Sequence, residues 1–316
     1  MLNRRHLRIK VLQAIYAFFQ SHHTNRLVAE KELFKNIEQI YDLYLYLLLV
    51  FEEFVSIENN RIDELKNKRF LSEEDINPNR KFVNNAIFAI LESNRELIDM
   101  SAAKKVNWGG AEKQENLRKM MTSIRNSEAY TFYMAETNTS FQDDTAFVIE
   151  LFKEQIANSP IIYSFFEEMS IHWIDDIDLA CSMVIKTIKT FKEDGENKKI
   201  LPLYKDEEDE KDFISRLFKQ SIDSYEENQK LIDELISNWE LDRLAIMDIF
   251  LMNLAITEVK EFSNIPIKVT LNEYIEISKY YSTPKSNGFI NGVLDKAVER
   301  LKKENKITKV GRGLMD

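Results

Sequence analysis

The sequence predicts an all-α protein. Apolar residues recur with helical periodicity along nearly the whole chain, and no segment shows convincing strand alternation. The 316 residues include only 7 Gly and 5 Pro, with 44% hydrophobic and 30% charged residues. This composition is typical of a soluble helical protein, and the length is sufficient for two domains, each with its own core.

The periodicity places the helices in order along the chain. They are expected at about 3–22, 30–68 (with room for one break), 80–100, 113–136, 145–158, 160–173, 176–192, 211–237, 241–260, 268–281 and 287–303. Turn-forming residues mark the breaks at Asn77-Pro78-Asn79, at Trp108-Gly109-Gly110 and around Asn138-Thr139-Ser140. The stretch 193–211 contains Gly195, Pro202 and the acidic run 206–210, which is more typical of a solvated linker than of a metal site.

The chain also contains a weak internal sequence repeat. Eight residues recur 66 positions later in a gapless alignment of thirty positions: Phe147, Leu151, Phe152, Lys153, Ile156, Glu168, Trp173 and Asp176 match Phe213, Leu217, Phe218, Lys219, Ile222, Glu234, Trp239 and Asp242. Helical patterning alone explains matching leucines and phenylalanines better than it explains paired tryptophans. We therefore predict that 147–176 is a degenerate repeat of 213–242.

Several classes of protein are excluded by composition. The single cysteine, Cys181, rules out an internal disulfide framework and fits a reducing compartment. The longest apolar run, Leu43 to Phe51, is far shorter than the roughly 20 residues of a membrane span. The charged N-terminus lacks the apolar core of a signal peptide. We expect a cytoplasmic protein with no membrane association.

No enzymatic constellation is visible. The four histidines are His6, His22, His23 and His172, and the adjacent pair has poor spacing for chelation on a helix. Gly109-Gly110 lacks the lysine and the spacing of a phosphate-binding loop. We expect no catalytic residue, no cofactor and no metal site, although a catalytic site assembled from distant residues stays an alternative.

Positive charge is concentrated at the two ends of the chain. Residues 1–29 contain five Lys/Arg and no carboxylate, and residues 266–316 contain ten Lys/Arg and six Asp/Glu, within a chain of net charge −10. If the ends fold together, they form a local basic patch on an otherwise acidic protein, which suits selective rather than general RNA contact. Ordinary solvated charge is the alternative.

The first helix places arginines on its apolar side. Leu7, Val11, Leu12, Ile15, Tyr16, Phe18 and Phe19 fill one broad arc, and Arg4, Arg5 and Arg8 fall within it. Because unpaired arginines cannot share a core with phenylalanines, we expect the first two turns to overhang the bundle and present guanidinium groups to phosphates and bases. Salt bridges to the acidic body are the alternative.

A glycine-flanked block begins the last helix. Gly288 and Gly292 lie four residues apart around Phe289. Glycine costs about 1 kcal/mol relative to alanine inside a helix, so its presence usually lets something come close. Close helix packing is one explanation, and a ligand against the helix start, where Asn287 or Ser286 can cap, is the other.

Three blocks together resemble the NusB family of transcription antitermination factors. They are Arg4-Arg5-His6-Leu7-Arg8, Leu241-Asp242-Arg243-Leu244-Ala245-Ile246-Met247, and the segment from Pro266-Ile267-Lys268-Val269 and Asn272-Glu273 to Phe289-Ile290-Asn291-Gly292-Val293-Leu294-Asp295-Lys296. The blocks occur in the family's order and cover about residues 1–20 and 210–300. The resemblance implies a NusB-like helical bundle with an additional helical domain inserted.

The implied boundaries are 1–22 for the arginine-rich first helix, 23–205 for the insert, 206–303 for the C-terminal core and 304–316 for a basic flexible tail.

The resemblance also implies a function. Family members bind single-stranded boxA RNA, the antitermination signal of ribosomal RNA leaders, together with NusE, a small-subunit ribosomal protein, in the RNA polymerase antitermination complex. Single-stranded bases are bound by stacking and edge hydrogen bonds. The matched RNA-binding positions are Arg4, Arg5, Arg8, Tyr16, Tyr281, Lys285, Phe289 and Asn291. His6 and Gly288 replace residues that are commonly basic in the family.

Two other functions stay open. NusB-like domains also precede certain ribosomal RNA methyltransferases, so an RNA-modification or ribosome-maturation accessory protein is one alternative. A helical scaffold without specific RNA binding is the other.

Overall fold

The computed structural model describes residues 1–21, 25–67, 72–194, 198–236 and 245–314. The chain divides into two compact units, a middle unit of residues 38–203 and a terminal unit of residues 2–37 and 204–316. Within the described residues the regular elements are α-helices with short 3₁₀ and π stretches, and no strand occurs, so the all-α prediction is confirmed. None of the described helices is long and apolar enough to span a membrane.

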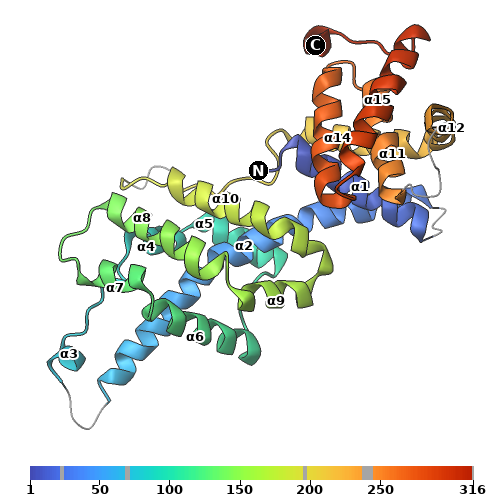
Figure 1. Ribbon diagram of the computed structural model, residues 1–316. Helices are drawn as coiled ribbons and strands as arrows, with labels where there is room; N and C mark the ends of the chain where they lie inside the picture. The colour runs from blue at the N-terminus through green and yellow to red at the C-terminus, as the bar shows by residue number, and fades with distance from the viewer. Residues whose placement is uncertain (22–24, 68–71, 195–197, 237–244, 315–316) are drawn as a thin grey trace. The chain divides into compact units, whose positions relative to one another are not determined.

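The middle unit is built from many short helices around the second part of one long helix (Figure 1). Its elements are the part of α2 (Arg26–Leu65) from residue 38 onward, α3 (Glu73–Ile76), α4 (Ala86–Glu92), α5 (Arg95–Lys104), α6 (Ala111–Arg125), α7 (Glu128–Ala135), α8 (Phe141–Leu151), a π turn (Phe152–Ile156), α9 (Pro160–Met169), a 3₁₀ turn (Ile171–Asp176) and α10 (Ile177–Thr190).

Aromatic side chains fill the core of the middle unit. The rings of Trp108, Phe166 and Trp173 surround Tyr46 of α2 at centroid distances between 5.3 and 6.1 Å. The Trp108 Nε1–H donates to the main-chain oxygen of Tyr46 over 2.9 Å. The glycine turn at 109–110 follows Trp108, and Gly110, the N-cap of α6, has a φ of +113°, a conformation that glycine adopts without strain.

Side-chain caps divide several helices that the periodicity predicts as continuous. The expected helix 80–100 is two helices, because Asn94 caps α5 by accepting from the Leu97 N–H over 3.0 Å. The expected helix 113–136 ends at Arg125, and Ser127 caps α7. Apolar periodicity continues through such breaks, so it does not reveal a cap that redirects the chain.

The terminal unit combines both ends of the sequence. Figure 1 shows α1 beside the C-terminal helices, with α14 and α15 next to each other. Its elements are α1 (Arg4–Gln20), the start of α2, α11 (Glu207–Asp223), α12 (Tyr225–Ile236), α13 (Ile246–Glu261), α14 (Ile267–Tyr281), α15 (Ser286–Lys303) and a 3₁₀ turn (Gly311–Leu314).

Helix α13 is the centre of the terminal unit. It contacts α1, α11, α12, α14 and α15, and every residue from Phe250 to Val259 is buried. A helix that is apolar on all sides is expected at the core of a bundle. Its buried polar residues are hydrogen-bonded; Asn253, for example, donates to the main-chain oxygen of Ser221 over 2.9 Å. Residues 241–244 of the second resemblance block lie outside the described residues.

The predicted repeat divides at corresponding positions. The first segment changes from the π turn to α9 between Ile156 and Pro160, and the second changes from α11 to α12 at Ser224, which lies at the same offset of 66 residues. Trp239 and Asp242 fall outside the described residues. The relation between the two segments stays a prediction.

The C-terminal segment, expected as a flexible tail, makes specific contacts with the turn between α13 and α14. The Val310 N–H donates to the main-chain oxygen of Ser263 over 3.0 Å. Lys309 Nζ donates to the main-chain oxygen of Phe262 over 2.8 Å. Gly313 lies against Ser263 so closely that a Cβ there would be 1.9 Å from the Ser263 oxygen. Only glycine fits this contact without a shift of the backbone.

Candidate functional site

The expectation that Arg8 overhangs the bundle is wrong. Its side chain is 2% exposed, and its Nε and Nη2 donate to the Glu258 carboxylate over 2.8 and 2.6 Å. Glu258 lies on α13 and is fully buried. A buried carboxylate needs a partner charge and several donors, and Arg8 supplies the charge. Arg8 therefore follows the alternative given for the arginines of the first helix, a salt bridge to an acidic residue of the protein itself.

Two residues of α14 complete the contacts of Glu258. Thr270 Oγ1 donates to Oε1 over 2.8 Å, and the Tyr274 hydroxyl donates to Oε2 over 3.1 Å. Burial raises the pKa of Tyr274 well above its ordinary value, and the charge of Glu258 adds to this. Burial by itself lowers the pKa of Arg8, but the charge and hydrogen bonds of Glu258 outweigh it and leave the pKa raised. The cluster joins α1, α13 and α14.

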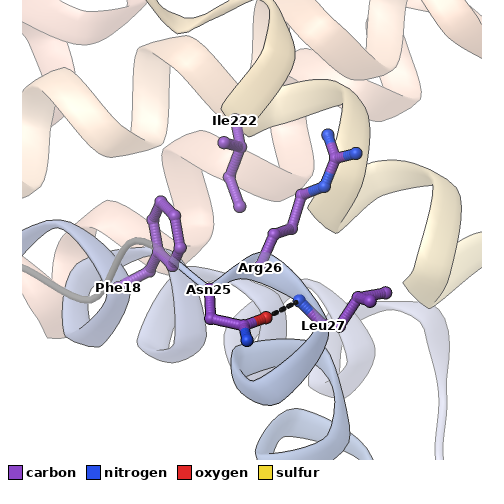
Figure 2. Close-up of a pocket in the computed structure, with 5 residues that line it drawn as sticks. All are labelled: Phe18, Asn25, Arg26, Leu27 and Ile222. Atoms are coloured by element: carbon purple, nitrogen blue, oxygen red, sulfur yellow. Dashed lines mark hydrogen bonds between the residues drawn. The ribbon is translucent and has the colours of Figure 1, made fainter.

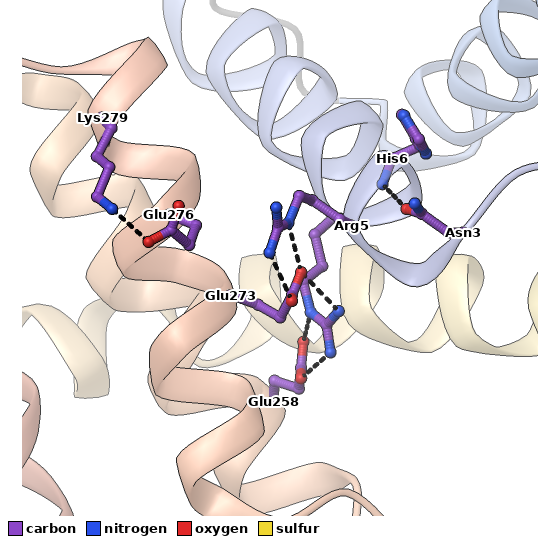
Figure 3. A network of polar contacts seen from close by, with 8 residues as sticks. Asn3, Arg5, His6, Glu258, Glu273, Glu276 and Lys279 are labelled. Atoms are coloured by element: carbon purple, nitrogen blue, oxygen red, sulfur yellow. Dashed lines mark hydrogen bonds and ion pairs between the residues drawn. The ribbon is translucent and has the colours of Figure 1, made fainter. Parts of the chain in front are cut away.

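Arg5 is half exposed and forms a second ion pair, which joins α1 to α14. Figure 3 shows its guanidinium reaching Glu273 of α14, to which Nε and Nη2 each donate over 2.9 Å. The hydrogen bonds from Arg5 hold the pKa of Glu273 below its usual value, opposed by burial and reinforced by the nearby charge of Arg8. Two of the five donors of a guanidinium are used in this pair.

Arg4 faces α11. Its Nη2 pairs with Asp209, and its guanidinium carbon lies 4.1 Å from the centroid of the Phe213 ring, within the range of a cation–π contact. Asp209 belongs to the acidic run 206–210, which begins α11 with Asp206 as its cap. Part of this run is therefore the first turn of a helix that balances the charge of α1. All three arginines thus pair with carboxylates of the terminal unit.

The tyrosines of the predicted site lie farther along the same helices. Tyr16 is 40% exposed, and its ring meets Phe250 of α13 edge-on at 6.1 Å. Gln13 Nε2 donates to the Tyr281 hydroxyl over 3.4 Å. Because Arg5 pairs with Glu273 and Gln13 with Tyr281, α1 and α14 run parallel, and the two contacts lie roughly 12 Å apart along the helix axis.

A buried carboxylate holds the turn between α14 and α15. Asp248 accepts from the Ser282 hydroxyl and, over 2.8 Å, from the Ser286 hydroxyl. Ser286 is the first residue of α15 and is buried. Lys285 in the same turn is exposed. Asp248 therefore positions the segment that carries Lys285 and the glycine block.

The glycines of this block are not closely packed against other described residues of the chain. Gly288 and Gly292 are exposed, and a Cβ at either position would meet nothing within 4 Å. Phe289 is half buried between them, and Asn291 is exposed, with its amide 3.4 Å from Asp295 Oδ2. The start of α15 thus presents an open backbone surface beside an aromatic ring.

The structure groups the predicted residues into two clusters along α1 and α14. Arg4, Arg5 and Arg8 lie near the start of α14, and Tyr16, Tyr281, Lys285, Phe289 and Asn291 belong to the other end and the turn that follows. Sequence reasoning missed Glu258, Glu273 and Asp248. Glu258 was detectable as a lone carboxylate within the apolar run of α13, which can only be buried if it is paired.

Described residues of the terminal unit line two of its hollows. One, of about 650 Å³, is lined by Arg4, Arg5, Arg8, Pro266, Val269 and Arg312 among others. The second, of about 610 Å³, lies between the end of α1 and the start of α2 and is lined by Phe18, Asn25, Arg26, Leu27 and Ile222 (Figure 2). No group of three or more potential metal ligands occurs among the residues that the structure describes.

Comparison with known proteins places a family domain in this chain. The NusB family model matches residues 178–299. The match begins within α10 of the middle unit and ends within α15. No solved structure matches the chain.

Three relatives are each named transcription antitermination protein NusB. The protein of Salinibacter ruber is 40% identical over 33% of this chain and 66% of its own length. The protein of Chloroherpeton thalassium is 42% identical over 34% of this chain and 50% of its own length. The protein of Natranaerobius thermophilus is 43% identical over 25% of this chain and 59% of its own length. The chain thus spans between half and two thirds of the relatives it matches, and most of its own sequence lies outside the match. Residues 178–299 are thus similar to the NusB family, within a longer chain.

Proposed function

We propose that this protein is a non-enzymatic, RNA-binding transcription antitermination factor of ribosomal RNA operons. It binds boxA-like single-stranded RNA together with NusE in the antitermination complex of RNA polymerase, and it acts in the cytoplasm. The names of the relatives and the NusB family domain support this proposal. The observation that carries it is the open start of α15, where two exposed glycines flank Phe289.

The residues divide into different roles in this proposal. Phe289, Tyr281 and Tyr16 stack on bases, and Asn291 contacts a base edge. Lys285, Arg4 and Arg5 contact phosphates with the donors that their ion pairs leave. Arg8 is buried, so we assign it the positioning of α1 on α13 and α14 instead of a phosphate contact.

Fluorescence anisotropy with boxA-like and scrambled RNA, with and without NusE, tests the proposal. We expect a preference for the boxA-like RNA that NusE strengthens. We expect Phe289→Ala to lower the affinity by about tenfold, since stacking contributes roughly 1–3 kcal/mol per base. The matched control is Phe132→Ala, which removes a ring that is 71% exposed in the middle unit. Equal affinity for both RNAs under all conditions would reject the proposal and favour a scaffold role.

A further inference from the structure

The arginine hollow of the terminal unit has two kinds of wall. Arg4 and Arg5 of α1 form a charged side together with Glu273 of α14, the partner of Arg5, while Ile265, Pro266 and Val269 form an apolar side. Val269 is 45% exposed, so its surface is available to a ligand. A volume of about 650 Å³ lies within the range of small-ligand sites. A guanidinium group next to an apolar wall is suited to a nucleotide, which has an anionic group and a flat apolar face.

Arg312 reaches this hollow from the far end of the sequence. The C-terminal segment is fixed by the contact of Val310 with Ser263 and by the close approach of Gly313 to the same residue. Gly311 adopts a φ of +54°, in the left-handed region. Gly311 and Gly313, on either side of Arg312, therefore hold the backbone in a path that other residues would not easily adopt.

Arg312 differs from the other arginines of the hollow in its charge balance. Arg4, Arg5 and Arg8 pair with Asp209, Glu273 and Glu258. Arg312 is exposed, and the described part of the chain offers it no ion-pair partner. Among the described residues that line the hollow, Arg312 is therefore a positive charge without a paired carboxylate. An uncompensated guanidinium attracts an anion more strongly than one already paired with a carboxylate.

We propose that the hollow binds one nucleotide of the single-stranded RNA, with the phosphodiester group on Arg312 and Arg5 and the base against Pro266 and Val269. This inference rests on the proposed function and extends it. The hollow lies at the arginine end of the α1–α14 pair, and Tyr281 with the turn to α15 lies at the other end. The RNA strand accordingly follows α1 and α14 between the two ends. An acidic protein segment would need the arginines but not the apolar wall.

The test measures boxA-like RNA binding by anisotropy at several salt concentrations with the full chain. Arg312→Gln removes the charge, and Gly313→Ala displaces the segment that carries it. Lys303→Gln is the matched control, since it removes an exposed charge near the end of α15. We expect Arg312→Gln and Gly313→Ala each to lower the affinity about three- to tenfold and the salt slope by about 0.7. Lys303→Gln should leave both unchanged.

A second arm locates the phosphate. In a series of RNAs that each carry one uncharged methylphosphonate, one position should lower the affinity of the wild-type protein and have no effect on Arg312→Gln. If the wild-type protein prefers boxA-like RNA but both variants bind as Lys303→Gln does, the nucleotide site is refuted and the proposed function stands. If the wild-type protein does not bind RNA, both are refuted.

Discussion

The two ends of the α1–α14 pair differ in how their polar groups are satisfied. At the arginine end, Arg8 and Arg5 are paired with Glu258 and Glu273, and much of the charge is neutralised inside the protein. At the turn end, Asp248 fixes the backbone, while the glycines of α15 face open space. A cluster of basic residues is thus partly structural, while the turn end leaves both glycines of α15 exposed.

Neighbouring basic residues of one helix can have different structural roles. Arg8 and Arg5 lie three residues apart on one helix, but one is buried and the other is half exposed. The distribution of charge along the sequence does not distinguish Arg8 from Arg5. We therefore expect Arg8 to contribute mainly to stability and Arg5 to contribute to RNA binding as well.

The largest expected effect is on the buried pair. Arg8→Met leaves Glu258 buried without its counter-ion, and we expect it to destabilise the terminal unit by about 3–5 kcal/mol. Native-state hydrogen exchange of the α13 amides measures this unit separately from the middle unit. The double variant Arg8→Met/Glu258→Leu should recover part of the loss, because no unpaired charge remains. A single variant as stable as the wild type would contradict a structural role for Arg8.

The next largest effect is expected at the turn end, where a substitution should raise the stability of the terminal unit instead of lowering it. Gly292→Ala adds a Cβ that meets nothing within 4 Å, so we expect it to stabilise the terminal unit by up to about 1 kcal/mol through helix propensity. We expect the affinity for boxA-like RNA to fall, because the methyl group holds the strand away from the backbone. Hydrogen exchange and anisotropy measure the two effects.

Whether a glycine-to-alanine substitution stabilises or destabilises the protein depends on the backbone conformation of that glycine. Gly110→Ala, at a φ of +113°, should destabilise the middle unit by about 1 kcal/mol or more. If Gly292→Ala leaves RNA affinity unchanged, then close approach of RNA is not the reason for that glycine.

The smallest effect is the pH dependence of the exposed pair. The lowered pKa of Glu273 means that its ionised form stabilises the folded state above its ordinary value of 4.5, and that this contribution is lost as the pH falls through the folded-state value. Thermal unfolding of the wild type and Arg5→Gln should therefore differ most at neutral pH and converge in acid. A difference that is constant down to pH of about 2 would show that Glu273 is not the group involved.

Local sequence explains part of the site and misses another part for a physical reason. The start of α15 at Ser286 and the exposure of Lys285 agree with the glycine block and its preceding turn. The burial of Arg8 was not predictable from the arc of α1, because its cause is Glu258, which lies 250 residues away in the sequence. The divided helices at Asn94 and Ser127 were missed because caps act through single hydrogen bonds that do not alter periodicity.

The helical class, the NusB resemblance of the two ends and the glycine block can be read from the amino-acid sequence, because they depend on periodicity and on residues close together in the chain. Which charges are neutralised depends on the fold. It buried Arg8 against Glu258, paired Arg4 with Asp209 and left Arg312 without a partner among the described residues. A charge interacts with whatever the fold brings near it, and the energy of that interaction depends on burial and distance, neither of which a linear pattern specifies.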